Sequence, residues 1–243
     1  MTQPNSQAVA QHIGIVACSA EGAALCYRTI CLEAQQQLGT HVHPEVGMHT
    51  HSLADYVACL ERGDWEGVGE LMLSSAEKLA RGGARFLICP DNTIHQALPL
   101  IESRSPLPWL HIADAVGAQA VARNYRKLGL LGTRWLVESE VYPAKLEALG
   151  IGWVRPSPEE REEINRIIME ELVRGVVTPD TVPRFQAVIQ NLAAEGCDAV
   201  VLGCTEIPLV ISHENSRLPT LDSTRLLARA AIARAIEPAQ AAA

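Results

Sequence analysis

The sequence lacks the features that would place it in a membrane. No part of its 243 residues approaches the roughly 20 consecutive apolar residues that a membrane-spanning helix needs. The start, MTQPNSQAVAQH, has neither the basic segment nor the apolar segment of a secretory signal peptide. We therefore expect a cytoplasmic protein with no membrane as its partner.

Positive charge and aromatic residues are also scarce. The formal net charge is −8 and no dense run of Lys or Arg is present, which argues against nucleic acid as a partner. Aromatic residues make up 4% and hydrophobic residues 48% of the chain, which is long enough for one well-buried core or for two small lobes that share a cleft. This composition favours a small molecule as the partner.

A disulfide framework is not expected. The seven cysteines are an odd number, and no export signal accompanies them. We expect free thiols, and the simplest interpretation of most of them is a small buried apolar side chain.

Short apolar runs alternate with longer segments of helical periodicity, which is typical of parallel strands joined by crossover helices. The sequence therefore predicts an α/β fold. The expected strands are residues 13–18, 41–48, 85–89, 107–110, 127–132, 152–155, 199–203 and 218–221.

The clearest helix is predicted over residues 158–174. Ser157 can cap it, Pro158 suits its first turn, and Glu160 completes a capping box with Ser157. Gly175 follows the last helical residue, where glycine commonly ends a helix.

The two halves of the sequence match each other. Placing GARFLICPDNTIH over GCDAVVLGCTEIP gives a shift of 113 (196 minus 83), and a second match near the start of each half has a shift of 115 (129 minus 14). The matched pairs are Gly83 and Gly196, Asp91 and Cys204, Ile94 and Ile207, Gly14 and Gly129, and Tyr27 and Tyr142.

This repetition indicates a gene duplication that produced two similar lobes, each a mainly parallel sheet flanked by helices. We expect a pseudo-two-fold axis between them, with the active site at the interface. The expected divisions are an N-terminal lobe at 1–115, a C-terminal lobe at 116–220, and a C-terminal helix at 221–243 that packs back on the first lobe.

Asp91 and Cys204 are the candidate catalytic residues. Each follows a predicted strand, and ligands of parallel α/β sheets bind beyond the carboxyl ends of the strands. A helix N-terminus beside each of them could hold a carboxylate, and Asn92, Thr93 and Thr205 could supply further donors.

A thiol and a carboxyl group on opposite sides of one carbon can invert its configuration. One group removes a proton from one face while the other delivers a proton to the opposite face. The plainer interpretations are that Asp91 only caps the following helix and that Cys204 is a packed thiol under its loop.

The segments ICPDNTIH, VVLGCTEIPLVI, GTRWLVESEVYPAKLEALGI, IIMEELVRG and PTLDSTRLLARAAI resemble the aspartate/glutamate (Asp/Glu/hydantoin) racemase family over nearly the whole chain. The resemblance implies a two-lobed α/β enzyme that inverts amino acids without pyridoxal phosphate or another cofactor. It also implies two catalytic cysteines, one before an Asn-Thr pair and one in a Gly-Cys-Thr motif. Cys204 matches the second of these, and Asn92 with Thr93 matches the pair. A homodimer is likewise implied.

The sequence departs from this pattern at the first cysteine, where Asp91 stands before Asn92. Cys89 lies two positions earlier, about 6 to 7 Å further back along an extended strand, so we favour Asp91 as the reacting group. A carboxylate is a weaker base than a thiolate unless burial raises its pKa, so the two directions of inversion become unequal.

Two reactions remain open. One is racemisation or epimerisation by two-base proton transfer at Cα. The other is the chemistry of a superfamily lyase or cis-trans isomerase, resembling arylmalonate decarboxylase or maleate isomerase, in which Cys204 acts alone. A binding protein without activity is a third, less favoured interpretation.

The substrate side chain is not fixed by the sequence. An acidic amino acid needs a basic partner for its distal carboxylate, yet Arg62 is the only Lys or Arg between residues 29 and 77. The remaining candidates for this contact are Arg134, Lys145, Arg155 and Arg166, together with one of the histidines at 49 and 51. No metal site is expected from the histidines at 41, 43, 49 and 51, because the two pairs lie at opposite ends of one predicted strand.

Other polar residues lie close to the expected site. Ser19 and Thr133 occupy symmetry-related loops and are expected to contact the substrate. His95 and Glu206 closely follow the two candidate catalytic positions and could tune their pKa values.

Overall fold

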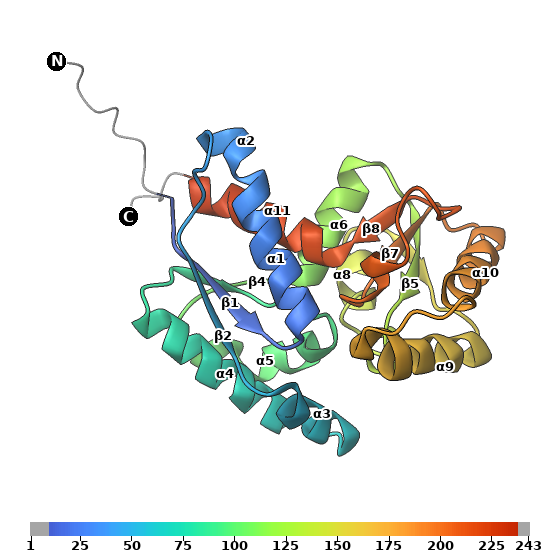
Figure 1. The fold of residues 1–243 in the computed structure, drawn as a ribbon, viewed down its shortest axis with the longest axis horizontal. Helices are drawn as coiled ribbons and strands as arrows, with labels where there is room; N and C mark the ends of the chain where they lie inside the picture. Colours follow the sequence, from blue (N-terminus) through green and yellow to red (C-terminus); the bar gives the residue numbers. More distant parts are fainter. Residues whose placement is uncertain (1–9, 238–243) are drawn as a thin grey trace.

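Among the residues that the structure describes, eight short strands form two separate parallel sheets, as the sequence predicts (Figure 1). The structure is a computed structural model that describes residues 10–237. The strand order is β2-β1-β3-β4 in the first sheet and β6-β5-β7-β8 in the second. The strands are β1 (Ile13–Ala17), β2 (Val46–Thr50), β3 (Phe86–Ile88), β4 (Trp109–Leu110), β5 (Lys127–Leu131), β6 (Gly152–Val154), β7 (Ala199–Leu202) and β8 (Thr220–Asp222).

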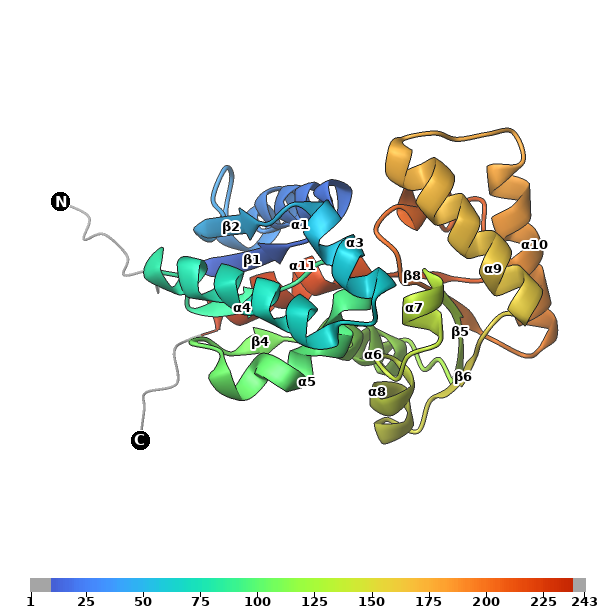
Figure 2. The same cartoon turned by 90° about the horizontal axis from the view of Figure 1, so that it is seen from below.

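Helices cover both faces of each sheet, so the expected α/β class with two similar lobes is confirmed (Figure 2). In the described part of the chain, no helix has the length and apolar character needed to cross a membrane. The α-helices are α1 (Ala20–Glu33), α2 (Gln35–Leu38), α3 (Leu53–Glu61), α4 (Trp65–Arg81), α5 (Leu98–Ile101), α6 (Ile112–Ala122), α7 (Arg134–Val137), α8 (Pro143–Ala148), α9 (Pro158–Arg166), α10 (Thr181–Ala194) and α11 (Ser223–Ile236).

Helices α6 and α11 each follow one sheet and pack on the other. Helix α11 leaves β8 and lies beside α1 on the first sheet, where Leu227 and Ile232 share a buried cluster with Ile13 and Ile30 (Figure 2). Helix α6 leaves β4, and its small apolar residues pack on the second sheet beside α8. The two exchanged helices also contact each other, so they bind the lobes together. The expected boundary at residue 115 falls inside α6, and the division of the chain into domains stays a prediction.

Strand β2 begins later than expected. The sequence suggested a strand over 41–48, whereas the structure has it at Val46–Thr50, with Val46 beside Ile13. Pro44 has no N–H to donate to a neighbouring strand, and His41 has a left-handed backbone with φ of 65°. These two residues delay the strand.

The segment predicted as a helix at 158–174 is helical throughout but not uniform. Ser157 and Glu160 form the expected capping box at the start of α9. A π-helical turn then runs over Ile167–Glu171, a 3-10 turn follows at Leu172–Arg174, and Gly175 ends the segment with φ of 71°. Such π-helical turns often occur at functional sites because they shift side chains from the regular helical face.

The sheet register confirms both shifts found in the sequence. Gly14 of β1 lies beside Leu87 of β3, and Gly129 of β5 lies beside Val200 of β7. These pairs are related by 115 (129 minus 14) on one strand and by 113 (200 minus 87) on the other. The two sheets are therefore built to the same plan.

We expect a side chain at Gly129 to destabilise the protein. A Cβ at Gly129 would lie 2.7 Å from Cδ1 and 3.2 Å from Cβ of Leu192 on α10. The helix therefore packs so close to β5 that position 129 has room only for glycine. Gly129→Ala should lower the free energy of unfolding by about 1–3 kcal/mol, as overpacking does elsewhere. Urea unfolding followed by circular dichroism measures this.

The matched control is Gly152→Ala on β6. This glycine is exposed, and the atom nearest to an added Cβ would be the Arg126 carbonyl oxygen at 3.5 Å, which is an ordinary van der Waals contact. The control should keep or slightly raise the stability, because alanine restricts the unfolded chain. Equal stability of the two variants would contradict the close approach of α10.

Candidate functional site

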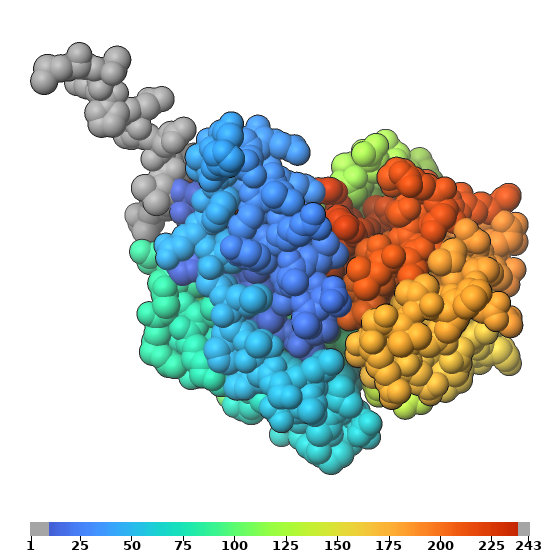
Figure 3. All heavy atoms as spheres, viewed as in Figure 1, coloured from blue at the N-terminus to red at the C-terminus, as the bar shows by residue number. Residues whose placement is uncertain are grey.

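A narrow cavity of about 60 Å³ lies between the two lobes, at the carboxyl ends of the central strands. One water molecule occupies roughly 30 Å³ in the liquid, so the cavity in this form has room for only a few water molecules. Figure 3 shows the seam along which the first lobe, in blue and cyan, meets the second, in orange and red. The lining residues are Cys18, Ser19, Leu53, Val57, Leu60, Asp91, Asn92, Thr93, Ile94, Thr133, Trp135, Ile168, Met169, Val173, Gly203, Cys204, Thr205 and Glu206.

Asp91 reaches the cavity from the loop after β3. Its carboxylate accepts a hydrogen bond from the Ile94 amide at 3.2 Å, so it is held against the 3-10 turn Thr93–Ala97 while it lines the cavity. Burial raises the pKa of Asp91, and the nearby negative charge of Glu206 adds to this increase. Hydrogen bonds from Ile94, Cys18 and Thr93 oppose it. Asp91 is therefore a stronger base than an ordinary aspartate.

Cys18 is a cavity residue that the sequence reasoning missed. It follows β1, and its thiol lies close enough to the Asp91 carboxylate for each group to shift the pKa of the other. Burial, followed by the negative charge of Asp91, raises the pKa of Cys18 well above its usual value. The signal available in the sequence was its place at the end of the first strand, in the loop that also holds Ser19.

Cys204 occupies the equivalent place in the second lobe, after β7. Its thiol donates to Glu206 Oε2 at 3.0 Å, and the Thr205 hydroxyl donates to the same oxygen at 2.7 Å. Burial raises the pKa of Cys204 well above its usual value, and the charge of Glu206 and this hydrogen bond add to the effect. The thiol is therefore protonated at neutral pH.

Two pairs of hydroxyl groups join the lobes at the cavity. Ser19 of the first lobe lies 3.0 Å from the Thr205 hydroxyl of the second, and Thr93 lies 2.9 Å from the Thr133 hydroxyl. Ser19 also caps α1 by accepting from the Gly22 amide at 3.2 Å. In this arrangement the hydroxyls satisfy one another, and each can instead donate to an anionic group placed between the lobes.

Asn92 lines the cavity, but its side chain is bonded on both sides. Its amide nitrogen donates to the Ser223 hydroxyl at 3.0 Å, and its oxygen accepts from the Tyr142 hydroxyl at 2.6 Å. Ser223 in turn donates to the Leu202 carbonyl at 2.9 Å. Asn92 thus ties the Asp91 loop to the start of α11 and to the second lobe.

His95 links the loop that carries Asp91 to the start of α6. Its Nδ1 lies 2.6 Å from the Asp91 carbonyl, and its Nε2 lies 3.3 Å from the Ile112 amide at the start of α6. Only a neutral ring with the proton on Nδ1 satisfies both contacts. Burial, with the neighbouring His111, lowers the pKa of His95 to about 3, so the ring stays neutral.

The basic residues considered for a distal carboxylate do not line the cavity. Lys145 pairs with Asp114 at 3.0 Å, and Arg166 pairs with Glu171 at 2.9 Å. Arg155 donates to the Val137 carbonyl, while the exposed Arg134 stacks on the Trp135 ring with its Cζ 5.1 Å from the centroid.

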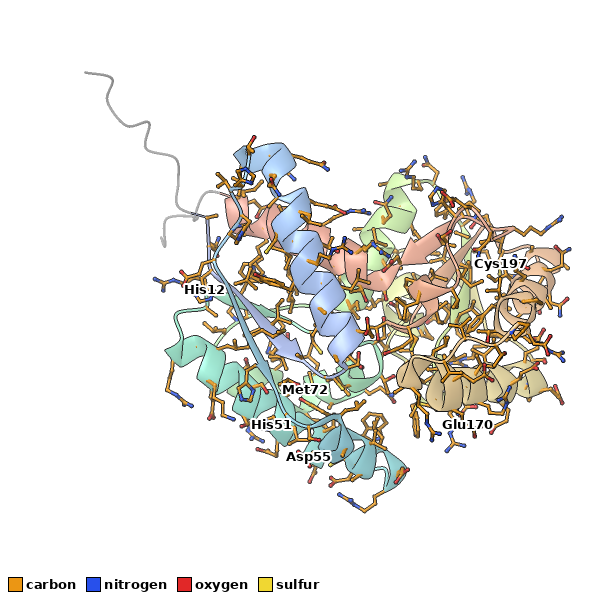
Figure 4. All side chains as sticks on the ribbon, viewed as in Figure 1. His12, His51, Asp55, Met72, Glu170 and Cys197 are labelled. Carbon is orange, nitrogen blue, oxygen red and sulfur yellow. The ribbon has the colours of Figure 1, made fainter. Side chains whose placement is uncertain are left out.

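Histidines 49 and 51 do not line the cavity either. His49 contacts Ser75 at 2.9 Å, and His51, labelled in Figure 4, contacts Ser74 at 3.2 Å, so both rings lie against α4. Cys89 is fully buried behind Asp91, with its thiol 3.9 Å from the Asp91 carbonyl. Within residues 10–237, no group of three or more His, Cys, Asp or Glu is placed to hold a metal ion.

Comparison with known families gives a match over most of the chain. The sequence model described as Asp/Glu/Hydantoin racemase matches residues 13–231. The broad specificity amino-acid racemase RacX of Bacillus subtilis (strain 168) is 24% identical over 172 residues, which are 70% of this chain and 73% of RacX. A glutamate racemase of Thermus thermophilus is 29% identical over 187 residues, covering 74% of this chain and 63% of the relative.

Solved structures share the whole architecture. A proposed Asp/Glu racemase from Yersinia pestis has a TM-score of 0.85 and 32% identity, covering 93% of this chain and 100% of that one. An aspartate racemase homologue from Pyrococcus horikoshii OT3 has a TM-score of 0.80 and 29% identity, with the same coverage of 93% and 100%.

We expect the hydrogen bond from Tyr142 to Asn92 to contribute to stability. Tyr142→Phe removes a donor and leaves a buried amide oxygen without that partner, which should lower the free energy of unfolding by about 1–3 kcal/mol. Tyr27→Phe is the matched control, because Tyr27 is its sequence counterpart in the first half but is 45% exposed on α1. The control should change stability by less than about 0.5 kcal/mol in urea unfolding. Similar losses in both variants would argue against this bond.

Proposed function

The chain belongs to the Asp/Glu/hydantoin racemase family, and we propose that it is a cofactor-independent racemase or epimerase of amino acids. The observation that carries this proposal is the pair formed by Asp91 and Cys204, which reach one cavity from equivalent loops of two similar sheets. We further propose that it works in the cytoplasm as a homodimer.

In the proposed reaction, Asp91 and Cys204 act on opposite faces of the substrate Cα. Asp91 removes the Cα proton, since burial makes it a stronger base than an ordinary carboxylate. The protonated thiol of Cys204 delivers its proton to the other face. The product is the opposite enantiomer, with Asp91 left protonated and Cys204 left as a thiolate.

The proton balance of this proposal closes on Asp91 and Cys204 alone. One turnover leaves Asp91 protonated and Cys204 as a thiolate, which is the state that the reverse direction requires, and proton exchange with water restores the starting state. The Glu206 carboxylate accepts a hydrogen bond from the Cys204 thiol and so holds the protonated thiol in place. In the reverse direction the Cys204 thiolate removes the Cα proton and protonated Asp91 returns one. Because a carboxyl group and a thiol differ in acidity, kcat and KM are expected to differ between the two directions, while kcat/KM is equal in both because the enantiomers have the same free energy.

The hydroxyls at the seam are proposed to bind the substrate carboxylate. Ser19, Thr93, Thr133 and Thr205 pair with one another across the lobes. When the lobes open and close on a substrate, the same groups can donate to its carboxylate and to the enolate-like intermediate. We propose that Asn92 fixes the loop that carries Asp91 and Thr93, since its own side chain is bonded to Ser223 and Tyr142.

Hydrogen exchange at Cα is the direct test of this function. In D2O, the enzyme should replace the Cα proton of its substrate with deuterium, seen as loss of the Cα proton signal in NMR across a panel of L- and D-amino acids. Cys204→Ser and Asp91→Asn should each lower the rate of racemisation by about 10²- to 10⁴-fold, because each removes one general acid or base.

Two results would argue against the two-base proposal. Exchange with none of the amino acids would exclude the racemase function and favour the lyase or cis-trans isomerase alternative. Full turnover in Asp91→Asn would indicate that Cys204 acts alone. Cys197→Ser is the matched control, since this buried cysteine lies outside the cavity lining and should leave exchange unchanged.

The pH dependence should report on Asp91. As the base, Asp91 must be ionised, so kcat/KM should fall as pH decreases through its raised pKa. Cys18→Ala removes a side chain that lowers this pKa, so the acid limb of the profile should move to higher pH. Cys26→Ala, at a buried cysteine of α1 outside the cavity lining, should leave the limb in place. A limb that does not respond to Cys18→Ala would argue against Asp91 as the titrating base.

A further inference from the structure

The wall of the cleft indicates the class of substrate, a question that the proposed function leaves open. We propose that the enzyme acts on amino acids with an apolar side chain and not on acidic ones. This inference rests on the proposed function for the reaction itself, while its structural argument concerns the cleft lining alone.

The first lobe contributes an apolar face of α3 to the cleft. Leu53, Val57 and Leu60 all line the cavity and are partly buried. Their spacing of four and three residues places them on one side of the helix. The two sequence neighbours of Val57, Tyr56 and Ala58, are absent from the lining. Helix α3 therefore presents a hydrocarbon surface to whatever the cleft encloses.

The second lobe faces it with further apolar groups. Trp135 comes from α7, Ile168 and Met169 from the π-helical turn, and Val173 from the 3-10 turn that follows. Glu170, labelled in Figure 4, is exposed and pairs with Arg166, so it does not join this wall. The π-helical turn thus places Ile168 and Met169 at the cavity while Glu170 stays in solvent.

The charges in the lining have one sign. Asp91 and Glu206 are its carboxylate side chains, and no Lys, Arg or His among residues 10–237 lines the cavity. The ammonium group of any amino acid is attracted to this pair of carboxylates. The α-carboxylate can accept hydrogen bonds from the hydroxyl groups of the seam, which belong to Ser19, Thr93, Thr133 and Thr205. A second carboxylate on the substrate side chain would have no cation and would lie near two like charges in a water-poor site.

These observations together define the ligand. A side chain that enters between α3 and the π-helical turn exchanges water for hydrocarbon, which favours leucine or methionine over a shorter or charged side chain. An aspartate or glutamate side chain in the same place loses its hydration without gaining an ion pair. The missing basic residue and the apolar wall therefore have the same consequence for substrate choice.

Binding and exchange measured together test the inference. Isothermal titration calorimetry with wild-type protein and with Cys204→Ser would give Kd values for L- and D-leucine, methionine, aspartate and glutamate. We expect the two apolar amino acids to bind about 10-fold or more tightly than the two acidic ones. The same samples in D2O, followed by NMR, show which of them lose the Cα proton.

A charge placed in the apolar wall should reverse the preference. Leu60→Arg puts a cation on the cavity side of α3, so it should weaken leucine binding and strengthen glutamate binding, each by about 10-fold. Leu32→Arg is the matched control, since Leu32 is 54% exposed on α1 and lies outside the cavity lining. The control should leave all Kd values unchanged.

The outcomes separate the two proposals. Acidic amino acids that bind as tightly as apolar ones, or an absence of binding by all of them, would overturn the inference about substrate class. Apolar amino acids that bind without losing the Cα proton would support that inference and refute the racemase function. Preferential binding with exchange supports both.

Discussion

The reciprocal exchange of α6 and α11 is the constraint on which the rest of the molecule depends. Helix α11 follows the second sheet but covers one face of the first, and α6 follows the first sheet but covers one face of the second. The two helices also pack against each other. Burial of their apolar faces therefore stabilises both lobes and holds them together. The first residues of these helices, Ile112 and Ser223, also bond to the loop that carries Asp91, through His95 and Asn92. The position of the candidate base thus depends on the same exchange that joins the lobes.

The seam between the lobes is held by groups that are also available to a ligand. Hydroxyl pairs cross it, the Cys204 thiol donates to Glu206, and the Cys18 thiol lies near the Asp91 carboxylate. Two buried carboxylates, with no cation among the described residues of the lining, raise the pKa values of their neighbours and destabilise the closed site. An ammonium group in the cleft would offset this negative charge, so under the proposed function we expect substrate binding to stabilise the site.

Much of the fold and part of the site could be predicted from local patterns. Strand periodicity located both sheets, and the internal shifts of 113 (196 minus 83) and 115 (129 minus 14) agree with the observed register. The delay of β2 past Pro44 and the π-helical turn at Ile167–Glu171 are small local departures that no periodicity reveals. The helix exchange could not be read as a pattern, because it consists of contacts between segments far apart in the chain.

Cys18 was missed because a single thiol at the end of a strand is indistinguishable from a core residue. The catalytic roles of Asp91 and Cys204 stay predictions.

Under the proposed mechanism, one physical requirement accounts for both the aspartate at position 91 and the lack of a basic residue in the described cleft lining. The family resemblance implies two thiols around the substrate, which can be neutral and so tolerate an acidic side chain once a cation is present. Replacing one thiol with a carboxylate adds a charge that an acidic substrate would have to approach in a site of low polarity. A cation added to compensate for this charge would pair with Asp91 and lower the pKa of its carboxyl group, which would make Asp91 a weaker base. A carboxylate base therefore works best when the surroundings are apolar and the substrate carries only one negative group. The apolar wall formed by α3 and the π-helical turn meets that condition.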